Sequence, residues 1–225
     1  IRDRLNNMES RGPDSAGFAI YKNEGNKAYK FSLCINNLKF NIFKKELSKK
    51  IKKIKLNQIS DHVILKTEEK PKKVIEIINS NFPEVSIVGY GKSIEIFKQV
   101  GNPKDVVKKF KLADFTGTHG IGHTRMATES AITTDGSHPY STGEDECLVH
   151  NGSLSNHNNL RRELTKKGNV FNSENDTEVA AGYVSHSLSN KKTLKDTLTS
   201  GLKDLDGFYT FITGTRNGFA VVRDE

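Results

Sequence analysis

The sequence has no tryptophan, only two cysteines and no long hydrophobic run. No segment approaches the ~18 consecutive apolar residues of a membrane-spanning helix, and none has the features of a secretory signal peptide. Cys34 and Cys147 lie far apart and lack Cys-x-x-Cys spacing, so neither a disulfide framework nor a structural zinc site is indicated. These absences predict a cytoplasmic protein that makes no contact with a membrane.

Aromatic residues are also too sparse to favour nucleic-acid binding. The net charge is +8, but the lysines concentrate between Lys44 and Lys73, where few aromatic side chains are available to stack on bases. We interpret these lysines as solvated helix faces. The 225 residues, 34% of them hydrophobic and 28% charged, are typical of a globular protein with one large domain or two small ones.

The chain divides by texture into three parts, residues 1–21, 22–115 and 116–225. The first part predicts a polar helix, a turn and a buried strand. The second is rich in lysine and predicts a small α+β insertion. Its expected elements are a helix at 74–78, strands at 85–88 and 94–100, and a helix that starts at Asn102 and Pro103 and buries Val106, Val107 and Phe110.

The third part crowds small and polar residues at the ends of predicted elements. Strands are expected at 117–125 and 146–151, and a hairpin of strands at 208–214 and 219–223. We also expect three helices. The first is marked by Leu154, Leu160 and Leu164 and ends near Gly168, the second is capped by Asp176 or Thr177, and the third spans 193–205. Working residues usually stand on such rigid element ends.

Four polar clusters occupy these positions: Arg11-Gly12-Pro13-Asp14-Ser15, Gly122-His123-Thr124-Arg125, His150-Asn151-Gly152 and Asn175-Asp176-Thr177-Glu178. Each alone has an ordinary explanation. An arginine and a glycine beside a proline form a turn, and an arginine at a strand end makes a surface ion pair. An Asn-Gly pair forms a hairpin turn, and an Asp-Thr pair caps a helix.

Together the clusters suit one small substrate that carries a carboxylate, an ammonium and a carboxamide. Arg125 offers a planar guanidinium for an α-carboxylate, and Asp176 offers a carboxylate for an α-ammonium. The Asn151 amide and the unhindered N–H of Gly152 supply two donors for the oxyanion that forms when an amide carbonyl is attacked. We expect His123, Thr124 and His150 to support the site by hydrogen bonding.

In this order the clusters resemble those of the class II glutamine amidotransferase domain. The resemblance implies an α+β fold, the N-terminal-nucleophile αββα four-layer sandwich, with residues 1–21 and 116–225 as the amidotransferase domain and 22–115 as an insertion. It also implies roles for Arg11 and Arg125 in substrate binding, with Arg125 on the glutamine carboxylate. Asn151 and Gly152 match the oxyanion hole, and Asp176 matches the residue that binds the substrate ammonium.

Longer stretches, 120–130, 148–158, 175–181 and 204–211, resemble stand-alone amidotransferase subunits related to glutamate synthase and N-methylglutamate synthase. The resemblance implies a glutaminase that releases ammonia from L-glutamine for a partner synthase subunit. In that group the partner carries a flavin, whereas the amidotransferase domain itself carries no cofactor. The sequence is compatible with a homo-oligomer.

The sequence departs from the family in its nucleophile. Family members begin with a cysteine that uses its own α-amino group as base, and a strand and a helix separate this cysteine from the motif arginine. In this sequence only ten residues precede Arg11, and the first is Ile1. Cys147 is expected to be a buried, inert thiol, and Cys34 lies away from every motif. Either the first strand and a closing C-terminal part lie outside this sequence, or the protein is a degenerate glutamine-binding or regulatory module. We expect the former, because a sheet that lacks a strand exposes unpaired backbone groups.

Two other chemistries are not favoured. His119 and His123 have a spacing that would place both on one face of a helix, but the neighbouring glycines predict a strand, on which they stand ~13 Å apart. No metal is therefore expected. Ser15 and Ser153 are not part of a Gly-x-Ser-x-Gly elbow, so a serine nucleophile is not indicated.

Overall fold

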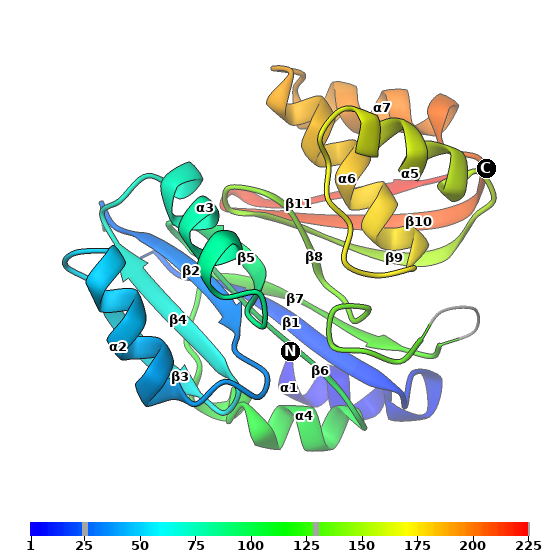
Figure 1. Cartoon of the computed structure of the whole chain (residues 1–225). Coiled ribbons are helices and arrows are strands. Elements are labelled where there is room, and N and C mark those ends of the chain that lie inside the picture. Colours follow the sequence, from blue (N-terminus) through cyan, green and yellow to red (C-terminus); the bar gives the residue numbers. More distant parts are fainter. Residues whose placement is uncertain (24–26, 128–130, 225) are drawn as a thin grey trace.

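The computed structural model describes residues 1–23, 27–127 and 131–224 (Figure 1). The helices are α1 (Arg2–Asn7), α2 (Phe40–Lys50), α3 (Pro71–Asn81), α4 (Pro103–Lys109), α5 (His157–Lys166), α6 (Asp176–Ser189) and α7 (Leu194–Asp204), with short 3-10 turns η1 (Glu9–Arg11) and η2 (Leu112–Asp114). The strands are β1 (Ser15–Tyr21), β2 (Tyr29–Cys34), β3 (Lys55–Ile59), β4 (His62–Thr67), β5 (Ser86–Gly91), β6 (Ile94–Val100), β7 (His119–Arg125), β8 (Tyr140–Gly143), β9 (Glu146–Leu154), β10 (Gly207–Thr215) and β11 (Gly218–Arg223).

Two antiparallel sheets face each other in the centre of the molecule. One has the strand order β6-β1-β7 and the other β11-β10-β9-β8. Every residue of β1 is buried, because both faces of this central strand are covered. The apolar layer between the sheets includes Tyr21, Ile121, Cys147 and Val149. Burial of these side chains holds β7 and β9, which carry two of the polar clusters, against one another.

Helices cover both outer faces of this pair of sheets. Phe18 of β1 packs with Val106 of α4 and with Phe110, on the side where α1 also lies. On the opposite side Val184 of α6 packs with Phe211 of β10 in a core to which α7 also contributes. Figure 1 shows the resulting order of helix, sheet, sheet and helix. The predicted αββα sandwich is confirmed.

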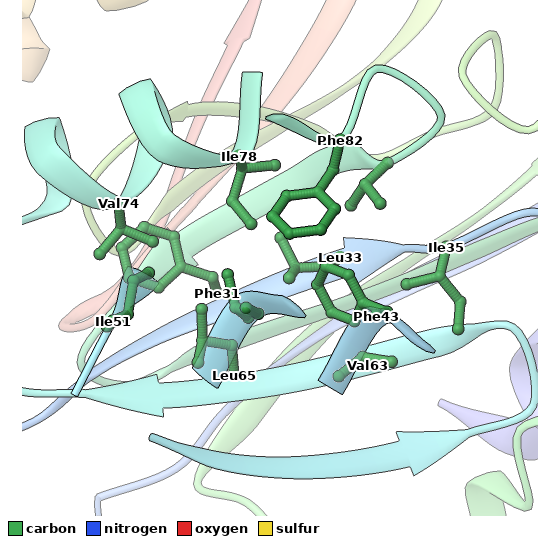
Figure 2. Close-up of a cluster of buried hydrophobic side chains, with 12 residues drawn as sticks. Phe31, Leu33, Ile35, Phe43, Ile51, Val63, Leu65, Val74, Ile78 and Phe82 are labelled. Carbon is green, nitrogen blue, oxygen red and sulfur yellow. The ribbon is translucent and has the colours of Figure 1, made fainter. Parts of the chain in front are cut away.

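A third sheet, of order β3-β4-β2-β5, has a hydrophobic core of its own. The two helices that cover it place buried apolar residues four positions apart, Phe43 and Leu47 in α2 and Val74 and Ile78 in α3. This spacing aligns the side chains on one helix face. Figure 2 shows Phe43, Val74 and Ile78 gathered with Phe31. Leu47 belongs to the same core.

The sheets show how the lysine-rich segment joins the sandwich. The core around Phe31 involves β2 to β5 with α2 and α3, all within residues 22–115. Strand β6, which the prediction places in the same insertion, pairs with β1 along its full length, from Ser15 and Val100 to Tyr21 and Ile94. Its helix neighbour α4 also packs on β1. The domain limits of 1–21, 22–115 and 116–225 stay a prediction.

Most expected elements are present, with corrections at their ends. The predicted cap of α4 is confirmed, because the Asn102 side chain accepts a hydrogen bond from the Lys104 N–H at 3.0 Å. The cap of α6 was wrongly predicted: Asn175, not Asp176 or Thr177, accepts the 2.8 Å bond from the Thr177 N–H. Leu154 ends β9 and does not belong to the following helix, which starts at His157.

In the part of the chain that the structure describes, no helix is both long and apolar enough to cross a membrane.

Candidate active site

The four polar clusters converge on one pocket with a volume of about 560 Å³. They reach it from η1, β7, β9 and the start of α6, which belong to different layers of the sandwich. All the sequence-predicted site residues line the pocket: Arg11, His123, Thr124, Arg125, His150, Asn151, Gly152 and Asp176. The stretch 120–130 also contributes, but its residues 128–130 lie outside the described part of the chain.

The placement of Arg11 and Arg125 in the pocket depends on a close approach between their two backbone segments. Arg125 ends β7 opposite Ser15 and is only 7% exposed, and its Nη1 donates to the Ala131 carbonyl at 3.4 Å. Arg11 is exposed. Between them, a Cβ atom at Gly12 would lie 2.4 Å from the Thr124 carbonyl carbon, closer than any side chain tolerates. Glycine at this position therefore lets the Arg11 segment lie directly on β7.

Asn151 and Gly152 lie in β9, not in a hairpin turn. Gly152 has a φ of +140°, and a Cβ atom there would lie 2.0 Å from the Phe208 carbonyl oxygen of β10. Only glycine fits this position. Because Gly152 has no side chain, the backbone at this position stays accessible from the pocket, next to the exposed Asn151.

Asp176 is the first residue of α6 and its carboxylate is tied to β9. Oδ2 accepts a 2.9 Å hydrogen bond from the Leu154 N–H, and Oδ1 lies 3.7 Å from the His150 Nδ1. Burial opposes ionisation, but the His150 ring and the Leu154 and Thr177 backbone groups outweigh it and hold the pKa of Asp176 below its ordinary value. The pocket therefore presents a fixed negative charge near neutral pH.

Histidines form the floor between the two sheets. The Nε2 of His123 donates to the His150 carbonyl at 3.0 Å, a bond from β7 to β9. The His123 ring stacks on His138, with centroids 4.1 Å apart. Burial lowers the pKa of His123 to about 4 and that of His138 well below its ordinary value. Both rings are therefore neutral at neutral pH.

This burial predicts acid sensitivity. The unfolded pKa of histidine is about 6.5, so between pH 6.5 and 4 the unfolded chain binds protons that folded His123 does not. The free energy of unfolding should fall as the pH falls through this range, by about 3 kcal/mol for His123. Urea unfolding at several pH values measures this slope. His123→Gln should flatten it, whereas His186→Gln, on the partly exposed side of α6, should not. An equal slope in the His123 variant contradicts the assignment.

Several pocket residues were missed by sequence reasoning: His138, His157, Glu174, Asn175 and Thr177. The Nε2 of His138 lies 3.0 Å from the Thr177 Oγ1. Its segment is held by Lys98, whose ammonium donates to the Asp135 and Ser137 carbonyls at 3.0 and 2.9 Å. The sequence signal for Asn175 and Thr177 was their place beside Asp176, whereas His138 lies far from every motif.

Neither cysteine lines the pocket. Cys147 is buried 3.5 Å from the Tyr21 hydroxyl, and burial raises the pKa of its thiol to about 12. Burial also raises the pKa of the Cys34 thiol, to about 11. A raised pKa disfavours the nucleophilic thiolate. The predicted burial of Cys147 is confirmed, and its inertness stays a prediction. Ser153 lines the pocket, whereas Ser15 is fully buried in β1.

Among the described residues, one group of metal-ligand side chains lies elsewhere, at the paired ends of β2 and β4. One atom each of Cys34, Asp61 and His62 lies within 4.8 Å of the others. The Lys109 ammonium, 2.9 Å from the Asp61 Oδ2, already compensates that carboxylate. His119 and His123 both lie on the extended strand β7, as predicted.

Comparison with known proteins identifies the family. The chain is 48% identical over 227 residues to the glutamine amidotransferase-like protein GlxB of Rhizobium meliloti, which covers all of this chain and 75% of that protein. The chain belongs to the class II glutamine amidotransferases. It is also 30% identical to a putative glutamine amidotransferase of Methanothermobacter thermautotrophicus, over 98% of this chain and 77% of that protein. Residues 123–225 match the glutamine amidotransferase domain as a family.

Longer relatives match about half of this chain or more. A glutamine–fructose-6-phosphate aminotransferase of Methanococcus maripaludis is 36% identical over 53% of this chain and 21% of its own length. Among solved structures, the glutamine phosphoribosylpyrophosphate amidotransferase of B. subtilis matches 99% of this amidotransferase with a TM-score of 0.60 and 20% identity. The chain spans about a third of that structure, 34%. This likeness supports the N-terminal-nucleophile fold.

Proposed function

We propose that the pocket binds L-glutamine and that the protein hydrolyses its side-chain amide to glutamate and ammonia. The convergence of Arg125, Asn151, Gly152 and Asp176 on one pocket carries this proposal. Two opposite charges and a set of amide donors match the carboxylate, the ammonium and the carboxamide of one amino acid. The pocket volume of about 560 Å³ accommodates a molecule of this size.

The charged walls would orient the substrate. The guanidinium of Arg125 binds the α-carboxylate through two parallel N–H groups, and the Asp176 carboxylate binds the α-ammonium. Because Arg125 is 7% exposed and Asp176 is tied to the Leu154 N–H, neither group needs to rearrange before binding. Ordered groups lose less entropy when the substrate arrives.

The amide donors would stabilise the reaction intermediate. A thiolate attacks the side-chain carbonyl carbon, and the negative charge that develops on oxygen is bound by the Asn151 amide and the Gly152 N–H. The carbon–nitrogen bond then breaks, and the nitrogen leaves as ammonia after it accepts a proton. Water hydrolyses the resulting thioester, which releases glutamate and restores the thiol.

The thiol for this step is proposed to lie outside residues 1–225. Cys34 and Cys147 do not line the pocket, and burial raises the pKa of both. A terminal cysteine would supply a nucleophile and, through its α-amino group, a base. Intact-mass analysis of the protein from its native source, with a glutaminase assay on the same sample, tests this. Turnover by a chain that starts at Ile1 would contradict it, and glutamine binding without turnover by the native protein would indicate a sensor.

The ammonia is proposed to serve a partner synthase subunit related to glutamate synthase. This rests on the stretches 148–158, 175–181 and 204–211, which resemble such stand-alone subunits. The relatives named as aminotransferases also join such a domain to a longer chain, of which this sequence covers about a fifth (21%). A flavin would belong to the partner. Co-purification of a flavin-containing protein with the native amidotransferase tests the proposal. An ammonia-dependent activity of that partner that does not change when the amidotransferase is present counts against it.

Asp176→Asn should weaken glutamine binding about 10- to 100-fold, because a charged hydrogen bond to the ammonium is worth about 1.5–3 kcal/mol. Calorimetric titration measures the dissociation constant. Glu174→Gln is the matched control, because Glu174 lines the same pocket and has no assigned role. Equal losses in the two variants would mean that the pocket needs negative charge in general and not Asp176 in particular.

A further inference from the structure

The Thr177 hydroxyl lies where three polar groups meet beneath the pocket. Its Oγ1 is 3.0 Å from the His138 Nε2, 2.9 Å from the His150 Nδ1 and 3.4 Å from the Asp176 Oδ1. Thr177 is 1% exposed, and both histidines are 4% exposed. Water therefore has little access to these atoms, and the groups must satisfy one another.

Counting protons leaves one arrangement that makes all three contacts hydrogen bonds. A hydroxyl has one proton and two lone pairs. Asp176 is ionised, because the pKa of its carboxyl is held low, so it can only accept. The Thr177 proton therefore goes to Asp176, and Thr177 accepts from both imidazoles. This fixes His150 as the Nδ1–H tautomer and His138 as the Nε2–H tautomer.

The atoms that this arrangement leaves without protons agree with their surroundings. The other ring nitrogens, Nδ1 of His138 and Nε2 of His150, are buried without a hydrogen-bond partner among the described residues. A buried ring nitrogen that has no proton and no partner costs less free energy than a buried N–H that has no acceptor. His123 follows the same rule, since its Nε2 faces a carbonyl and its Nδ1 has no partner among the described residues.

The hydroxyl also connects two parts of the pocket. Asp176 starts α6, whereas His150 precedes Asn151 on β9. We propose that Thr177 is a positioning residue whose hydroxyl sets the tautomers of His138 and His150 and orients the Asp176 carboxylate toward the substrate. Its effect on glutamine rests on the proposed function, whereas its effect on the tautomers does not.

The tautomers can be read directly. Long-range ¹H–¹⁵N correlation spectra of the ¹⁵N-histidine-labelled protein at neutral pH should show His150 protonated on Nδ1, and His123 and His138 on Nε2. Single histidine-to-glutamine variants assign the signals. A proton on the Nε2 of His150 in the intact protein would overturn the proposal, whether or not the protein binds glutamine.

Two substitutions separate the hydroxyl from packing. Thr177→Val keeps the shape and removes the hydroxyl, and it should weaken glutamine binding about tenfold, the equivalent of one lost hydrogen bond. It should also mix the His150 tautomers. Thr177→Ser keeps the hydroxyl and should stay within about twofold of the native affinity, as one retained bond requires. The reverse order, with valine tolerated and serine harmful, would assign Thr177 to packing alone. Failure of the unsubstituted protein to bind glutamine would contradict the proposed function and leave the tautomer result standing.

Discussion

Replacing Asn151 with alanine is expected to lower the turnover of glutamine by about 10²-fold or more, as for other oxyanion-hole donors. The side-chain amide would meet the carbonyl oxygen when charge develops on it, so its loss should reduce the turnover number more than substrate affinity. Steady-state kinetics of the protein from its native source measures both. The exposed position of Asn151 on β9 makes a folding defect a small part of the effect.

Ser153→Ala is the matched control for this experiment. Ser153 lies two residues further along β9, so its side chain points to the same face of the strand, and it lines the same pocket. Near-native activity in this variant would also exclude Ser153 as a nucleophile. Equal turnover in the Asn151 variant and the native protein would remove the oxyanion-hole assignment.

Arg125→Lys is expected to weaken glutamine binding about 10²-fold although the charge is kept. A lysine ammonium cannot make the two parallel bonds that a guanidinium makes to a carboxylate, and a charged hydrogen bond is worth up to about 3 kcal/mol. The low exposure of Arg125, 7%, keeps solvent from compensating for the loss. The dissociation constant of L-glutamine, measured by calorimetry, checks this expectation.

Arg11→Lys provides the comparison. Arg11 lines the same pocket but is exposed, so water screens its contribution and its replacement should have a smaller effect. A larger loss in the Arg11 variant would transfer the carboxylate-binding role from β7 to η1. Circular dichroism of both variants verifies that the loss is not one of fold.

The sequence was most informative where a local pattern and the tertiary fold agreed. The helix α4 was predicted with its cap because Asn102 and Pro103 define its start and Val106 and Phe110 its buried face. The candidate site residues were proposed because their chemical types suit one substrate. Their meeting in one pocket then followed from the sandwich, which brings β7 and β9 together.

What the sequence could not reveal depends on contacts between distant segments. His138 reaches the pocket because its own segment is anchored on Lys98 of β6, 40 residues away. The cap of α6 is Asn175 and not Asp176, because the Asp176 carboxylate accepts instead from the Leu154 N–H of β9. The pairing of β6 with β1 likewise joins residues that the texture of the chain assigns to different parts.

The most direct test of the account is a calorimetric titration of the purified protein with L-glutamine, repeated with the Arg125→Lys and Asp176→Asn variants. We expect saturable binding of one glutamine per chain that both substitutions weaken at least about tenfold, the least that one lost charged hydrogen bond allows. No binding by the native protein, or binding that neither substitution changes, would contradict the assignment of this pocket to glutamine.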